Sequence, residues 1–89
     1  MINEIVNLIH QKIEIDSPFI ISFLTENLKS ELNFFPVEVR IDKLGLYVED
    51  KDGFYFWIQD VYNLKTSCYA DGCYRLTHPE SEYAYEISF

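Results

Sequence analysis

The spacing of hydrophobic residues changes at Pro36, from three or four residues before it to two residues after it. At the start of the chain, apolar side chains at helical spacing occupy Ile2, Ile5, Val6, Ile9 and Ile13. Polar residues fill the positions between them, so the pattern predicts an amphipathic helix over residues 2–14.

A second helix is predicted to begin near Asp16 and to end before Pro36. Asp16-Ser17-Pro18 offers an acceptor for free backbone amides and a proline suited to a first helical turn. Pro36 disfavours helical backbone at the residue before it. The predicted apolar stripe consists of Ile20, Ile21, Leu24, Leu28 and Leu32, widened by Phe19 and Phe23. We therefore expect Leu24 and Leu28 to face the core, where truncation to alanine costs about 2 to 5 kcal/mol.

After Pro36, apolar and polar residues alternate, which is typical of strands with one solvated face. The expected strands cover residues 37–42, 46–48, 54–58, 64–70, 73–77 and 83–89. Asp52-Gly53 and Asp71-Gly72 are predicted hairpin turns. Two N-terminal helices followed by an antiparallel meander of five or six strands predict a single α+β domain over residues 1–89, with both helices packed on one face of the sheet.

The charge of the chain limits the partners that it can bind. Fifteen acidic and seven basic residues give a net charge of −8, which repels phosphate backbones and anionic lipids. The chain also lacks an apolar run of membrane-spanning length and a recognisable secretory leader. We therefore expect a cytoplasmic protein with reduced thiols that contacts neither nucleic acid nor membrane directly.

Residues 67–74 read SCYADGCY and raise the question of a metal or redox site. A two-residue turn at Asp71-Gly72 predicts the cross-strand pairs Ala70 with Cys73, Tyr69 with Tyr74, and Cys68 with Arg75. The two cysteines then lie diagonally, where a disulfide requires distortion. An alternative is a zinc site of Cys68, Cys73 and His78, with a fourth ligand from Asp71, Glu80 or His10. Because zinc knuckles place their paired ligands closer together, we expect free thiols, no metal and no cofactor.

Catalytic motifs are also missing from the sequence. A nucleophilic pair of Cys73 and His78 would have no oxyanion motif beside it, and three glycines form no phosphate-binding loop. Asp50-Lys51-Asp52-Gly53 lacks the remaining ligand positions of a calcium loop. We therefore do not expect an enzyme.

Carboxylates and tyrosines are interleaved on the predicted hairpins and in the C-terminal segment, as at many protein interfaces. The expected partner-binding residues are Glu49, Asp50, Asp52, Tyr69, Asp71, Tyr74, Glu80, Glu82 and Tyr83. They favour a small, non-enzymatic inhibitor that blocks a basic protein such as a nuclease or another nucleic-acid-binding complex. Its role would be that of a phage or mobile-element anti-defence protein, or of a toxin-immunity protein. The alternative is an accessory subunit, homodimeric through an edge strand, whose acidity serves only solubility.

Overall fold

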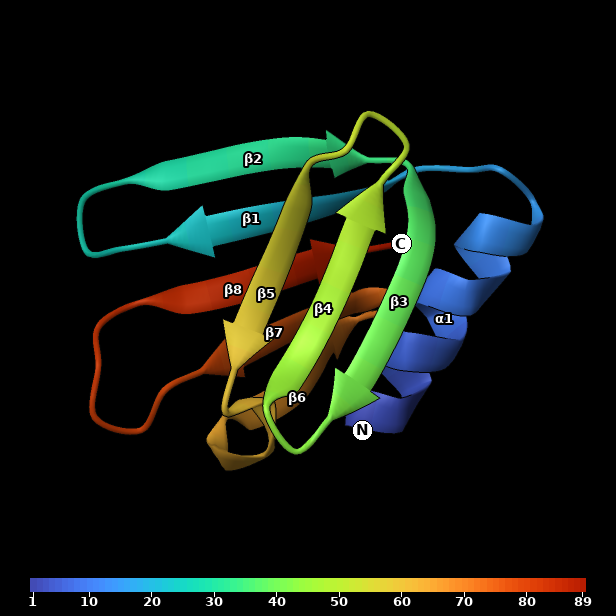
Figure 1. The fold of residues 1–89 in the computed structure, drawn as a ribbon. Helices are drawn as coiled ribbons and strands as arrows, with labels where there is room; N and C mark the ends of the chain where they lie inside the picture. The colour runs from blue at the N-terminus through green and yellow to red at the C-terminus, as the bar shows by residue number, and fades with distance from the viewer.

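The computed structural model describes residues 1–89 as one helix and eight strands in two antiparallel sheets (Figure 1). The large sheet has the strand order β2-β1-β8-β7-β6 and the small sheet β3-β4-β5. The elements are α1 (Ile2–Glu14), β1 (Phe19–Leu24), β2 (Lys29–Phe34), β3 (Pro36–Asp42), β4 (Gly45–Asp50), β5 (Tyr55–Gln59), the 3-10 turn η1 (Val61–Asn63), β6 (Lys65–Ala70), β7 (Cys73–Thr77) and β8 (Ala84–Ser88). The α+β class is confirmed, whereas the prediction of two helices and a single meander sheet is wrong.

The predicted second helix is the β1–β2 hairpin. Its turn is closed by a backbone hydrogen bond from Thr25 N–H to Leu28 C=O at 2.8 Å, and Leu28 N–H donates to Thr25 Oγ1 at 3.2 Å. A stripe with residues four apart fits a helix, but four is also a multiple of the two-residue period of a strand. Local preference favours the strand, since β-branched and aromatic residues dominate β1.

The core lies between the two sheets, because the small sheet covers part of the inner face of the large sheet, with the strands of the two sheets crossing (Figure 1). The buried apolar side chains of the sheets are Phe19, Ile21, Phe34, Val39, Leu46, Val48, Ile58, Tyr74, Leu76 and Ile87, joined by Val61 of η1. The helix packs against β3 and contributes Ile5 and Ile9, both fully buried. A second sheet therefore covers the large sheet, where the sequence analysis expected helices.

The strands after Pro36 agree with the alternating pattern, and the turn at Asp52-Gly53 joins β4 to β5 as expected. The β6–β7 hairpin differs from the prediction by a bulge between Cys68 and Ala70. Ala70 pairs with Cys73 as predicted. The other two predicted pairs are wrong, because the extra residue of the bulge places Cys68 opposite Tyr74 and Ser67 opposite Arg75.

Candidate partner-binding surfaces

Three carboxylates from two separate loops meet at one end of the large sheet. Glu26 lies in the β1–β2 turn, and Glu80 and Glu82 lie in the loop between β7 and β8; the two loops lie at the same end of the sheet in Figure 1. All three side chains line one open groove of about 570 Å³ together with Tyr83. We call these two loops, with their carboxylates Glu26, Glu80 and Glu82, the acidic loop pair.

Local hydrogen bonds hold the β7–β8 loop in place. Glu80 N–H donates to His78 Nδ1 at 3.1 Å, and Ser81 N–H donates to the His78 carbonyl at 3.4 Å. These bonds form a tight turn that directs Glu80 and Glu82 outward, where both residues are exposed. Pro79 suits such a turn because its φ is already fixed.

No basic side chain neutralises the acidic loop pair. The ion pairs of the molecule join Lys29 to Glu31, Arg40 to Glu38, and Arg75 to Glu86. Three exposed carboxylates without a counter-charge produce a local negative potential that attracts a cationic partner. The sequence analysis included Glu80 and Glu82 but missed Glu26, because its contribution depends on the hairpin that was taken for a helix.

An aromatic cluster lies beside the acidic loop pair. The Tyr83 ring stacks on Phe23 with centroids 5.9 Å apart, and it meets Tyr85 edge to face at 6.0 Å. Phe23 is 41% exposed although it is a large apolar residue. A second groove, of about 370 Å³, joins Tyr83 and Tyr85 to Trp57 at the edge of the small sheet. The aromatic surface therefore continues from the large sheet to β5.

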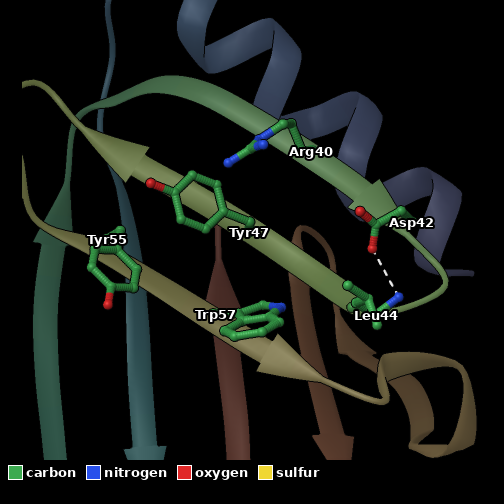
Figure 2. A pocket seen from close by; sticks show the side chains of 7 residues that line it. Arg40, Asp42, Leu44, Tyr47, Tyr55 and Trp57 are labelled. Carbon is green, nitrogen blue, oxygen red and sulfur yellow. Dashed lines mark hydrogen bonds between the residues drawn. The ribbon is translucent and has the colours of Figure 1, made fainter.

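Outward-facing residues of the small sheet form a second aromatic surface, which we call the aromatic face. Figure 2 shows Tyr47, Tyr55 and Trp57 on neighbouring strands, with the Arg40 side chain directed toward Tyr47. The Tyr47 and Tyr55 rings stack with centroids 5.4 Å apart, and the Arg40 guanidinium lies 4.5 Å from the Tyr47 ring centre. These residues line a shallow pocket of about 340 Å³ together with Gly45, where a Cβ would collide with the Ile58 carbonyl of β5.

The aromatic face carries charges of both signs. Tyr47 donates its hydroxyl hydrogen to Glu49 Oε1 at 3.2 Å, and burial together with this carboxylate raises the pKa of Tyr47. Asp42 Oδ1 accepts the Leu44 N–H at 2.8 Å and fixes the β3–β4 turn. The partner-binding residues expected from the sequence did not include Arg40, Tyr47, Tyr55 or Trp57. The alternation of exposed Tyr55 and Trp57 with inward Phe56 and Ile58 would have indicated the two residues of β5.

The acidic residues near the β4–β5 turn have three different environments. Asp50 is buried, and its carboxylate accepts the Phe35 N–H at 2.9 Å and the Asp52 N–H at 2.8 Å. Glu49 is half-buried on the aromatic face, whereas Asp52 is exposed at the turn. Asp50 is therefore a structural residue that fastens the β4–β5 turn to the start of β3, and it is not available to a partner.

The partner-binding residues that were expected on the β6–β7 hairpin do not share a face of the large sheet. Tyr74 is buried in the core, and its hydroxyl donates to Glu4 of the helix at 3.4 Å. Tyr69 lies on the outer face, with its ring centre 5.3 Å from the Arg75 guanidinium, and Asp71 is exposed at the turn. The expected partner-binding residues thus form no single patch, and Glu80, Glu82 and Tyr83 are the ones that the fold brings together.

The cysteines and histidines do not form a common site. Both cysteines are free thiols, and no cluster of three or more His, Cys, Asp or Glu side chains is arranged to hold a metal ion. Cys73 begins β7 and His78 follows its last residue, roughly 16 Å away at the usual rise of a strand. The two residues are therefore not within hydrogen-bonding distance of each other.

The fold and these surfaces define a small two-sheet α+β protein with an exposed aromatic and acidic surface. No helix of the structure is long and apolar enough to cross a membrane. No protein-family model matches the chain, and no curated protein or solved structure is detectably similar to it.

Proposed function

We propose that this protein is a non-enzymatic inhibitor that binds a basic, nucleic-acid-handling protein in the cytoplasm. The observation that supports this proposal best is the convergence of Glu26, Glu80 and Glu82 on one groove without a neutralising cation. A surface that binds nucleic acid is cationic, and a carboxylate cluster is complementary to it. The role would be that of an anti-defence protein or a toxin-immunity protein.

The aromatic residues next to the acidic loop pair would supply most of the binding energy. Trp57 is 46% exposed and Tyr55 is 62% exposed, so both present apolar area that the monomer does not bury. Interfaces commonly combine a central Trp or Tyr with a polar rim that excludes water. Trp57, Tyr55 and Tyr83 therefore form the proposed centre, and the acidic loop pair forms its rim.

The test starts with affinity capture of the partner from the host and continues with the purified pair. Glu26→Lys, Glu80→Lys and Glu82→Lys are each expected to slow association, by about 10-fold for the strongest, at low ionic strength and much less at high salt. Glu14→Lys is the matched control, because it changes the charge equally at the end of α1, away from both loops (Figure 1).

Trp57→Ala tests the aromatic centre. We expect faster dissociation and a loss of about 2 kcal/mol or more in binding free energy. Tyr62→Ala, which removes a 59% exposed aromatic ring from η1, should have little effect. The inhibitor proposal also requires that the complex no longer binds nucleic acid. An acidic partner, or a partner that keeps its full affinity for nucleic acid in the complex, would contradict it.

A further inference from the structure

Strand β2 forms an open edge of the large sheet. In Figure 1 it is the outermost strand beside β1, and no strand pairs with its other side. Its six residues pair with β1 in continuous register, without a bulge, and contain no proline. Proteins usually protect such an edge with charged side chains, a bulge, a proline or a covering segment, because a free edge pairs readily with another strand. Of these devices, β2 has only the charges of Lys29 and Glu31.

The pattern of hydrogen bonds shows which backbone groups are free on this edge. The hairpin closes with the bond from Thr25 N–H to Leu28 C=O, and bonding alternates along an antiparallel pair. Ser30, Leu32 and Phe34 therefore bond to β1. The N–H and C=O groups of Lys29, Glu31 and Asn33 point away from the sheet.

The two sides of β2 differ in character. Leu28, just before the strand, is 71% exposed and Leu32 is 60% exposed, on the side where Phe34 enters the core. Lys29 and Glu31 lie on the opposite side and form an exposed ion pair at 3.0 Å. The strand thus has one apolar side and one side with charges of both signs.

We propose that two copies of this chain form a homodimer by antiparallel pairing of their β2 strands, with Ser30 facing Ser30 across a two-fold axis. This register brings the outward backbone groups of Lys29 opposite those of Glu31 in the second copy, as hydrogen bonding requires. It also places Lys29 opposite Glu31 on the charged side, and Leu28 opposite Leu32 on the apolar side.

Charge selects this register over its neighbours. A shift centred on Glu31 would place two carboxylates directly opposite each other, and a shift centred on Lys29 would do the same with two ammonium groups. Like charges at facing positions destabilise a strand pair. Only the register centred on Ser30 is complementary in both charge and apolar contacts.

The second copy would also cover part of an apolar groove. A groove of about 530 Å³ runs between β2 and β5 and is lined by Leu32, Phe34, Phe54 and Phe56 among others. Phe54 is 72% exposed at this site. Leu28 of the second copy would lie beside Leu32 at the edge of this groove. Pairing therefore extends the large sheet from five strands to ten and buries side chains that are exposed in the monomer.

The test is a charge exchange measured by sedimentation equilibrium at low ionic strength. Lys29→Glu makes both facing pairs carboxylate with carboxylate, and Glu31→Lys makes both ammonium with ammonium. Each variant alone is expected to weaken the dimer by about 10-fold or more. An equimolar mixture of the two should restore dimerisation as a heterodimer, because every facing pair is then complementary.

Two features make the result decisive. Lys65→Glu on β6, at the opposite edge of the large sheet, changes the charge at an exposed site away from β2 and should leave the dimer intact. Circular dichroism of each variant checks that the monomer stays folded. A wild-type chain that is monomeric at millimolar concentration would overturn the proposal, and so would a mixture that forms no heterodimer. The inference does not depend on the proposed inhibitor function, because its test measures only self-association and none of Glu26, Glu80, Glu82 and Trp57 lies on β2.

Discussion

Asp50 and Asp52 are two residues apart but have opposite roles at the β4–β5 turn. The Asp50 carboxylate accepts two backbone N–H groups, whereas the Asp52 side chain is exposed. A buried backbone amide that loses its acceptor costs about 1 to 3 kcal/mol, because it cannot regain a bond to water. Sequence neighbours of the same type can therefore belong either to the fold or to a binding surface.

We expect Asp50→Ala to lower the free energy of unfolding by about 1 to 3 kcal/mol, because it removes the acceptor for Phe35 and Asp52 N–H. Asp52→Ala should change it by less than about 0.5 kcal/mol. Urea titrations of the two variants give the comparison. Equal stabilities would show that the Asp50 carboxylate does not fasten the turn.

Only part of the candidate surface could be expected from the sequence, because a pattern shows which residues are close in the chain but not which are close in the fold. Glu80, Glu82 and Tyr83 are close in sequence, so their clustering could be expected. Asp50 and Tyr74 were chosen for their residue type, and burial is set by neighbours that are distant in the chain. Glu26 was missed because it reaches the groove only when residues 19–34 form a hairpin.

At the scale of elements, the β1–β2 hairpin shows where a periodic pattern is ambiguous. Leu28 and Leu32 fit a helical stripe with Leu24, since they are four residues apart. In the hairpin, Leu24 lies on the opposite side from Leu28, and Leu28 is 71% exposed. The helix over residues 2–14 was predicted correctly because polar residues fill the positions between its apolar residues. Residues 19–24 are apolar at every position except Ser22, so they fit a helix and a strand equally well.

The same hairpin gives a prediction about stability. Leu76→Ala on β7 should cost about 2 to 5 kcal/mol, since Leu76 is fully buried and its truncation leaves a cavity. Leu28→Ala removes the same atoms from an exposed site and should cost less than about 0.5 kcal/mol in the monomer. Thermal or urea unfolding at a protein concentration that favours the monomer measures both. A large loss for Leu28→Ala would favour the helical arrangement.

At the scale of the whole molecule, we expect the free energy of unfolding to fall at acidic pH because of Glu86. Burial raises the pKa of Glu86, but the hydrogen bonds from Arg75 and Tyr69 and the charge of Arg75 outweigh it and hold the pKa below its usual value. Arg75 Nη2 lies 2.7 Å from Glu86 Oε2. A carboxyl with a lowered folded pKa stabilises the protein above its unfolded pKa, and this stabilisation is lost as the pH falls through the folded pKa.

We therefore expect the wild type to lose more stability than Glu86→Gln when the pH falls from about 6 to about 3, across the ordinary range of glutamate titration. The measurement is the free energy of unfolding of both proteins at several pH values. Glu80→Gln, which removes an exposed carboxylate, should retain the wild-type profile. Parallel curves for the wild type and Glu86→Gln would contradict the coupling between Glu86 and Arg75.

Periodicity predicted most of the strands after Pro36 but could not predict their arrangement. A pattern assigns each residue to a face of its strand, and it does not identify the neighbouring strand. The pairing of β1 with β8 joins residues 60 to 68 positions apart, and the division of the strands into two sheets likewise depends on contacts between distant segments. Such contacts are fixed by the packing of the whole chain.

The position of β8 in the middle of the large sheet has a consequence for biosynthesis. The ribosome produces β8 after all of its neighbours, so the emerging chain holds β1–β2 and β6–β7 as separate hairpins with no strand to join them. Isolated two-stranded hairpins are only marginally stable in water. The large sheet can therefore assemble only after β8 has left the exit tunnel, and until then the apolar sides of both hairpins are available to chaperones.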